Sequence, residues 1–297
     1  MKTIFIIGSG AMGIGIAQNC ITAGYKVILR DISESQLSKA IQSIESSLAR
    51  NVSKGKVTEA VMNAALSRLT TSTSLLNISE ADMVIEAASE NPAIKKAIFS
   101  EISKLCKDNA ILCTNTSSIS ITEIASYVSN STRFIGTHYF NPVPIMRLLE
   151  IVRGLTTSDE TVAIAIAFGK TLGKETIVSK DSPAFIVNRM LDPMINEAIS
   201  ILESGVGTIE DIDKGMRFGL NHPMGPLELI DMAGIDIELA VMEVLLSETG
   251  DPKYRPSVLL KNMVRAGLLG KKTGKGFYIY HENGTKESNP QLLSYLK

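Results

Sequence analysis

Hydrophobic and polar positions alternate along the N-terminal part of the chain in blocks that predict strands and helices in turn. Residues 3–7 form a continuous β-branched and aromatic run, which is typical of a strand buried on both faces of a parallel sheet. Later segments repeat this pattern, with strands expected over 25–31, 81–88, 110–116, 133–140 and 175–180 and helices over 11–23, 92–106, 119–128 and 160–173. The alternation predicts an α/β fold with a doubly wound parallel sheet.

The pattern changes near Ser182, where strand-like runs give way to helical ones. Ser182 is expected to cap a helix that starts at Pro183 and is kinked at Pro193. The helices expected in this part run from 183 to about 204, from 208 to 219 and from 227 to 247. We therefore predict two domains, an α/β domain over 1–181 and an all-helical domain over 182–297.

Composition and charge exclude several classes of protein. A chain of 297 residues with 44% hydrophobic and 21% charged residues is typical of a globular protein with a substantial core. The net charge of −1 gives no general attraction to nucleic acid or to a membrane. Three cysteines without CxxC spacing predict neither a disulfide framework nor a zinc site, and they favour a reducing compartment.

The N-terminus resembles a signal peptide superficially, because no charge occurs between Lys2 and Lys26. Glycines at positions 8, 10, 13 and 15 interrupt this run too often for a signal peptide or a membrane span. We therefore expect a cytoplasmic protein with no metal, no nucleic-acid partner and no membrane segment.

A G-x-G-x-x-G motif follows the first predicted strand, at Gly8, Gly10 and Gly13. The first glycine permits a tight turn, the second lets the backbone approach a pyrophosphate, and the third allows close packing of helix on strand. Asp31 ends the second strand, 18 residues after Gly13, near the position where a carboxylate binds the ribose of NAD and repels the 2′-phosphate of NADP. This context indicates a Rossmann-type domain that binds NAD. Asp31 could instead cap the next helix, and Arg30 beside it leaves the choice between NAD and NADP open.

Four polar residues lie at or just after the carboxyl ends of predicted strands, where ligands bind in doubly wound sheets. They are Glu90, Asn115, Ser117 and His138. Glu150 follows His138 by twelve positions, so the histidine is either a base held by a carboxylate or a residue of the core. Ser117 could equally cap the helix expected after it, and Glu90 could start the helix at residue 92, where an acid is favoured by the helix dipole.

Motifs along essentially the whole chain, in order and with compatible spacing, resemble the L-3-hydroxyacyl-CoA dehydrogenase family, in particular its bacterial 3-hydroxybutyryl-CoA members. The motifs are GSGAMGIGIAQ, VIEAASEN, TNTSSISIT, HYFNPVPIMRLLEI, AFIVNR, NHPMGPLELID and GLLGKKTGKGFY. The resemblance implies a reversible, NAD-dependent oxidation of an L-3-hydroxyacyl-CoA to a 3-ketoacyl-CoA. The expected substrates are the four-carbon pair 3-hydroxybutyryl-CoA and acetoacetyl-CoA. It also implies that the helical domain binds substrate and forms a homodimer.

The resemblance assigns catalytic roles to four residues. His138 and Glu150 would form a general acid–base pair, while Ser117 and Asn188 would hold the substrate. Asn188 lies in an otherwise apolar helical pattern, so its side chain needs a polar partner, which could be structural or a substrate oxygen.

Further contacts with cofactor and substrate follow from the same resemblance. Arg50 and Lys54, after the helix expected to follow Asp31, would contact the nucleotide of CoA. Ala184 departs from the family pattern, because a glycine is usual there, but this is not a catalytic position. The implied cofactor contacts are Gly8, Gly10, Ala11, Met12, Gly13, Asp31, Glu90, Lys95 and Asn115.

Two other functions stay open at this point. A β-hydroxyacid dehydrogenase of the 6-phosphogluconate type shares the glycine loop but uses a lysine on an interdomain helix. Here that helix offers Asn188 and Arg189, and no lysine occurs between positions 181 and 213. The other possibility is a non-catalytic relative, such as the lens crystallin built on this fold or an NAD-binding module. Retention of the four residues with implied catalytic roles argues against it.

Overall fold

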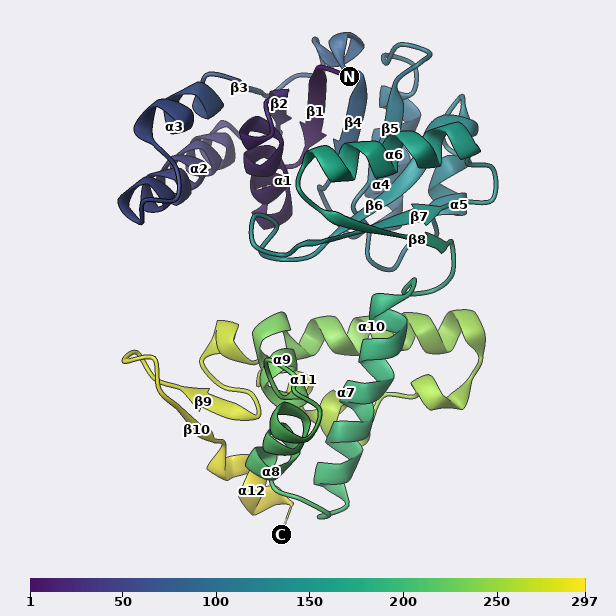
Figure 1. Ribbon diagram of the computed structural model, residues 1–297. Coiled ribbons are helices and arrows are strands. Elements are labelled where there is room, and N and C mark those ends of the chain that lie inside the picture. The colour runs from purple at the N-terminus through teal and green to yellow at the C-terminus, as the bar shows by residue number, and fades with distance from the viewer. Residues whose placement is uncertain (297) are drawn as a thin grey trace. The chain divides into compact units, whose positions relative to one another are not determined.

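The computed structural model describes residues 1–296, and the chain divides into two compact units, one over residues 1–182 and one that starts at Pro183. The first unit contains an eight-stranded sheet in the order β3-β2-β1-β4-β5-β6-β7-β8 (Figure 1). Its strands are β1 Thr3–Ile7, β2 Lys26–Arg30, β3 Leu69–Ser72, β4 Met83–Glu86, β5 Ile111–Thr114, β6 Phe134–Tyr139, β7 Leu148–Arg153 and β8 Glu175–Lys180.

All neighbouring strands of this sheet are parallel except β6 and β7, which are antiparallel. The Rossmann-type expectation is confirmed, with carboxyl ends of β1, β2, β4, β5 and β6 at one edge. The sequence did not predict β3 and β7. The run in β3 is short, polar and only half-buried, while β7 follows two prolines that obscure the pattern.

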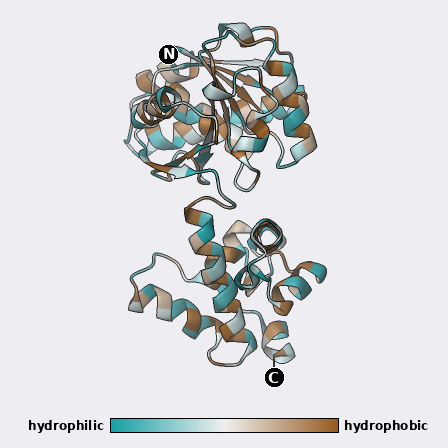
Figure 2. Ribbon diagram, turned by 90° about the vertical axis from the view of Figure 1, so that its right-hand side faces the viewer, coloured by the Kyte–Doolittle hydropathy of each residue, from teal (hydrophilic) through white to brown (hydrophobic). Residues whose placement is uncertain are grey.

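Helices α1 and α6 cover one face of the sheet, and α4 and α5 cover the other (Figure 1). Hydrophobic positions, brown in Figure 2, run through the central strands of this unit. Side chains of β1 and β4 form a core with Ile16 and Cys20 of α1 and Phe168 of α6. The helices are α1 Ala11–Thr22, α2 Glu34–Ser53, α3 Glu59–Leu66, α4 Pro92–Ile102, α5 Ile121–Ala125 and α6 Asp159–Thr171.

The second unit is helical, as predicted, with the addition of a two-stranded antiparallel ribbon. Its core is formed mainly by α7, α9 and α11 together with the ribbon. The helices are α7 Val187–Glu203, α8 Ile209–Lys214, α9 Pro226–Ala233, α10 Ile235–Thr249, α11 Val258–Arg265 and α12 Pro290–Tyr295, and the strands are β9 Tyr278–Tyr280 and β10 Lys286–Ser288.

Two helix boundaries in this unit differ from the prediction. The first helix starts at Val187 and not at Pro183, because Ala184 and Phe185 have positive φ angles of 57° and 55°. A left-handed backbone at Ala184 also explains why glycine is usual there in the family that the sequence resembles. The single helix expected over 227–247 is two helices, α9 and α10, which are separated at Gly234 with φ of 118°.

Two acidic side chains meet in the core of the helical unit. Asp192 of α7 and Glu238 of α10 are 3% and 4% exposed and hydrogen-bond to each other. Burial raises the pKa of Asp192 to about 7. Burial and the neighbouring Asp192 raise the pKa of Glu238 well above its usual range. At neutral pH the pair therefore retains a proton that the unfolded chain has released.

This pair predicts that stability falls with rising pH. Between the ordinary pKa of 3.8 and about 7 for Asp192, the folded state binds more protons than the unfolded state, so raising the pH favours unfolding. One pKa unit corresponds to about 1.4 kcal/mol, so Asp192→Asn should gain up to a few kcal/mol at alkaline pH. Urea unfolding of both proteins at acidic and alkaline pH measures this difference.

A matched control is Glu243→Gln, which neutralises an exposed carboxylate of α10, the helix of Glu238. Its free energy of unfolding should follow that of the wild type at each pH. Equal pH dependence for the wild type and Asp192→Asn would show that the buried pair does not control stability.

Candidate active site

His138 and Glu150 are direct neighbours across β6 and β7. The antiparallel register pairs them, so their side chains extend from the same face of the sheet. The two atoms His138 Nδ1 and Glu150 Oε2 lie 2.9 Å apart, and the side chains are 6% and 0% exposed. The carboxylate therefore fixes the orientation of the imidazole ring, and Nε2 is the ring nitrogen on the other side.

The loop that joins the two strands is held on both sides. Lys174 donates through Nζ to the carbonyl groups of Val143 and Met146 in this loop. On the other side, Val143 packs against Gly15 of α1, where an added Cβ would lie 2.8 Å from the valine side chain. These contacts tie the loop beside the pair to the rest of the α/β unit.

Glu90 organises the turn that carries Ser117. Its Oε1 atom accepts hydrogen bonds from the hydroxyl group of Thr116 at 2.6 Å and from the amides of Ser117 and Ser118 at 2.9 and 3.2 Å. Burial opposes ionisation of Glu90, but the Lys95 ammonium and these hydrogen bonds outweigh it and lower its pKa. Glu90 is therefore an ionised group at the carboxyl edge of the sheet.

Neither Glu90 nor Ser117 caps a helix. Asn91 caps α4, with its side-chain oxygen accepting from the amides of residues 93 and 94 at 2.9 and 3.2 Å. Ser120 caps α5, accepting from the amide of Glu123 at 3.1 Å. The capping alternative for Ser117 is therefore wrong, and Glu90 lies one residue before the cap of α4.

Asn115 connects the ends of β5 and β6. Its Oδ1 atom accepts from the amide of Tyr139 at 3.0 Å, directly after His138. The structure thus brings Glu90, Ser117, Asn115 and His138 to one edge of the sheet, through contacts between the ends of adjacent strands.

The glycine loop has the geometry that a pyrophosphate site requires. A Cβ at Gly13 would lie 1.9 Å from the carbonyl oxygen of Gly8, so helix and strand can approach only without a side chain. A Cβ at Gly10 would meet nothing within 4 Å, so the space beside it is open. α1 starts at Ala11, and the first-turn amides of Ala11, Met12 and Gly13 have no helical carbonyl to bind. The residues present therefore fit the phosphates of NAD.

Asp31 lies beside this loop at the end of β2. Its Oδ2 atom accepts from the amide and hydroxyl groups of Ser9, both at 2.8 Å, and its Oδ1 atom accepts from the amide of Ser33 at 3.1 Å. Burial opposes ionisation, but these bonds outweigh it and lower the pKa of Asp31. Ser33 caps α2, so the capping alternative for Asp31 is wrong.

Lys95, which the resemblance assigns to the cofactor, is a buried lysine of α4. Its Nζ atom donates to both carboxylate oxygens of Glu86 at 2.7 and 2.9 Å and lies 3.5 Å from Glu90 Oε2. Sequence reasoning missed Glu86. The available signal was a carboxylate at the end of the otherwise apolar strand MVIE.

Three predicted residues belong to elements other than those of this edge. Arg50 and Lys54 are exposed, one helical turn apart, at the C-terminal end of α2, whose 20 residues span roughly 30 Å. Asn188 is half-buried on the first turn of α7, in the helical unit.

Residues 1–296 contain neither a candidate metal-binding cluster nor a candidate membrane-spanning helix. In this part of the chain, no group of three or more histidine, cysteine or acidic side chains is placed to hold a metal ion. None of its helices combines the length and the apolar character needed to cross a membrane.

Two family models match the chain. The model for the NAD-binding domain of 3-hydroxyacyl-CoA dehydrogenase covers residues 3–182, and the model for the C-terminal domain of the same enzymes covers residues 185–280. Both units described above therefore have counterparts in one family.

Individual relatives agree over almost their full length. The 3-hydroxybutyryl-CoA dehydrogenase of Bradyrhizobium diazoefficiens is 48% identical over 280 residues, which are 94% of this chain and 96% of the relative. A probable 3-hydroxybutyryl-CoA dehydrogenase of Bacillus subtilis is 45% identical over 282 residues, 95% of this chain and 98% of the relative. The crystal structure of (S)-3-hydroxybutyryl-CoA dehydrogenase from Ralstonia eutropha matches with a TM-score of 0.93 and 50% identity, over 95% of this chain and 100% of that one. The chain therefore belongs to the 3-hydroxyacyl-CoA dehydrogenase family and is an NAD-dependent oxidoreductase.

Proposed function

We propose that the chain interconverts L-3-hydroxybutyryl-CoA and acetoacetyl-CoA, with His138 as the acid–base residue and Glu150 as its partner. The observation that carries the proposal is the buried contact of 2.9 Å between His138 Nδ1 and Glu150 Oε2. The four-carbon substrate is supported by relatives named for 3-hydroxybutyryl-CoA at 41–48% identity.

NAD, when bound, supplies the acceptor for the hydride that leaves the hydroxyl-bearing carbon. His138 accepts the hydroxyl proton through Nε2, because Nδ1 faces Glu150. The carboxylate of Glu150 holds the imidazole in one tautomer and stabilises the imidazolium that forms. In the direction of ketone reduction, His138 returns this proton to the substrate oxygen.

The remaining residues position the substrate. Ser117 binds the reacting oxygen through its hydroxyl group, and Glu90 keeps the Ser117 amide in place. Asn188 binds the thioester carbonyl. Arg50 and Lys54, exposed at the end of α2, bind the phosphates of the CoA nucleotide through their positive charges.

A spectrophotometric assay tests this function. Purified protein should oxidise NADH with acetoacetyl-CoA, and more efficiently than with a 3-ketoacyl-CoA of ten carbons. Membership of the family, with relatives named as dehydrogenases, argues against both the 6-phosphogluconate-type and the non-catalytic alternative. NADH binding without turnover of acetoacetyl-CoA would contradict the proposed reaction.

Asp31 should select NADH over NADPH. Its ionised carboxylate lies beside the glycine loop, where it accepts ribose hydroxyl groups and repels a 2′-phosphate. Asp31→Ala should raise KM for NADH roughly 10- to 100-fold, the loss expected for hydrogen bonds to a charged group. The ratio of kcat/KM for NADH and NADPH measures the change. A wild-type preference for NADPH would contradict the assignment and direct attention to Arg30.

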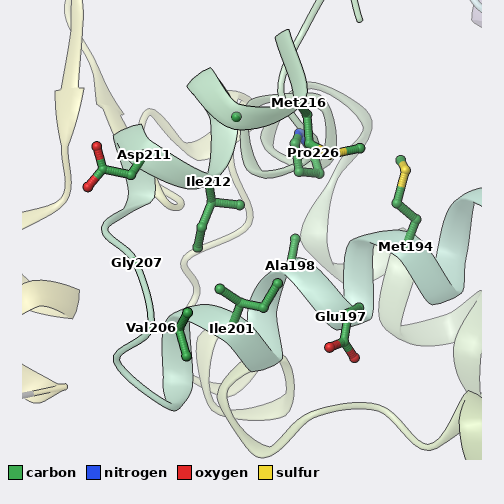
Figure 3. Close-up of a pocket in the computed structure, with 11 residues that line it drawn as sticks. Met194, Glu197, Ala198, Ile201, Val206, Gly207, Asp211, Ile212, Met216 and Pro226 are labelled. Carbon is green, nitrogen blue, oxygen red and sulfur yellow. The ribbon is translucent and has the colours of Figure 1, made fainter. Parts of the chain in front are cut away.

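The helical unit has a surface suited to a second copy of the chain. A pocket of about 440 Å³ lies between α7 and α8, and Figure 3 shows Met194, Ala198 and Ile201 opposite Ile212. Exposed apolar side chains on the same unit include Met190, Val206, Phe218 and Leu220. Apolar surface of this kind often marks an interface. Sedimentation should therefore give twice the chain mass of 32.0 kDa, and a monomer would contradict the proposed dimer.

A further inference from the structure

Glu86 is a buried charge at the end of β4 that connects three elements of the cofactor edge. Its side chain is 0% exposed, and it accepts from Lys95 of α4, from the hydroxyl group of Thr114 of β5 at 2.7 Å and from the amide of Ala88 at 2.9 Å. Removing a carboxylate from water costs several kcal/mol unless such partners compensate for it. The contacts therefore fix Glu86 and make it an anchor for its neighbours.

Lys95 is shared between two carboxylates of unequal exposure. Its Nζ atom lies 2.7 Å from Glu86 Oε2 and 3.5 Å from Glu90 Oε2. Glu86 is fully buried, whereas the side chain of Glu90 is 42% exposed. The three side chains thus form a row of negative, positive and negative charge from the core of the sheet to its edge.

Glu90 Oε1, the oxygen that does not face Lys95, holds the turn that contains Ser117, the proposed substrate-binding residue. Glu90 Oε1 accepts from the amides of Ser117 and Ser118, while Oε2 faces Lys95. A shorter distance between Lys95 and Glu90 would draw this carboxylate away from the turn. The Lys95 ammonium and the Ser117 turn are therefore joined through a single carboxylate.

We infer that Glu86 is a positioning residue for the reaction, because it holds Lys95 so that Glu90 remains bound to the Ser117 turn. This inference rests on the proposed function. Without the charge of Glu86, the buried ammonium retains only Glu90 among the carboxylates that it contacts in residues 1–296. Ion pairs strengthen in a medium of low dielectric constant, so Glu90 turns inward and releases the Ser117 amide.

Glu86→Gln keeps the shape of the side chain and removes its charge. A reacting group displaced by about 1 Å loses up to roughly 100-fold in rate, so kcat with acetoacetyl-CoA should fall about tenfold or more. NADH affinity is measured separately and kcat is taken at saturating NADH, because Lys95 and Glu90 are also implied cofactor contacts. Glu101→Gln, an exposed glutamate of the same helix as Lys95, is the matched control.

A double-mutant cycle tests whether Glu86 acts through Glu90. We would measure kcat per NADH-binding site for the wild type, Glu86→Gln, Glu90→Gln and the double variant. If Glu86 acts through Glu90, the effects of the two substitutions on kcat are not additive. The double variant should then have about the kcat of Glu90→Gln alone. The inference would be overturned if the fold losses of kcat in the two single variants multiply in the double variant. It would also be overturned if the kcat of Glu86→Gln lies within about twofold of the wild type.

Two further outcomes are distinguished by the same measurements. A purely structural role would lower the number of NADH-binding sites and leave kcat per site unchanged, which also overturns the inference. If the wild type does not turn over acetoacetyl-CoA, the proposed function is wrong, and this result is seen before any variant is compared. If Glu86→Gln does not fold, Thr114→Val takes its place, since it removes a hydroxyl group that donates to Glu86 at 2.7 Å and accepts from the Thr116 amide at 3.3 Å. Its smaller loss of kcat should disappear in the Glu90→Gln background.

Discussion

The His138→Gln variant should bind NADH with nearly wild-type affinity and lose roughly 100- to 10,000-fold in kcat, the contribution expected of general acid–base catalysis. Glutamine fills similar space but cannot accept the hydroxyl proton and return it. The buried carboxylate of Glu150 keeps a hydrogen-bonding partner, because the amide of glutamine can donate to it. Steady-state kinetics with acetoacetyl-CoA and a fluorescence titration with NADH measure the two effects separately.

Glu150→Gln tests the partner of His138, and His281→Gln serves as a control. Glu150→Gln should also lower kcat, because the imidazolium loses its charged partner. His281→Gln changes a histidine of the β9–β10 turn and should leave kcat unaltered. If folded His138→Gln binds NADH and keeps more than about a tenth of kcat, the histidine is a core residue and not the acid–base group.

The Gly13→Ala variant should lose both stability and cofactor binding. Its Cβ would lie 1.9 Å from the carbonyl oxygen of Gly8, and backbone atoms have no side-chain rotation by which to relieve the contact. Overpacking of this kind costs about 1–3 kcal/mol and occasionally more, and here α1 must move away from β1. Urea unfolding should show a lower midpoint, and NADH titration should show no saturable binding.

Gly10→Ala is the matched change in the same loop, and it should leave stability unchanged. The backbone at Gly10 has φ of −71°, which alanine adopts without strain, and the added Cβ meets nothing within 4 Å. Stability should therefore equal that of the wild type, while NADH affinity falls by about tenfold or more because the methyl group occupies pyrophosphate space. Unchanged NADH affinity in this variant would contradict the location of the phosphate site.

The sequence predicted the edge of the sheet well, because strand ends and polar residues coincide there. It could not decide between capping and ligand-binding roles, since a polar residue before a helix suits both. In the structure the capping residues lie one to three positions after Asp31, Glu90 and Ser117. Ser33, Asn91 and Ser120 cap the helices, so Asp31, Glu90 and Ser117 belong to the edge of the sheet.

Features that depend on contacts distant in the sequence were not predictable. β7 was missed because its partner β6 lies across a proline-containing loop, and only the register shows that His138 faces Glu150. The late start of α7 depends on the positive φ angles of Ala184 and Phe185, which neither residue type indicates. Glu86 was missed because the partners that stabilise its buried charge, Lys95 of α4 and Thr114 of β5, lie on other elements.

The antiparallel pairing of β6 and β7 has a consequence for insertions and deletions. The His138–Glu150 contact is set by the strand ladder, and the loop over 140–147 contributes no atom to it. A residue gained or lost in that loop leaves the pairing intact, at the cost of its contacts with Lys174. One residue gained between 148 and 150 would turn Glu150 to the opposite face of the sheet, since side chains alternate along a strand. Length variation in natural or designed homologues should therefore gather in the loop and avoid both strands.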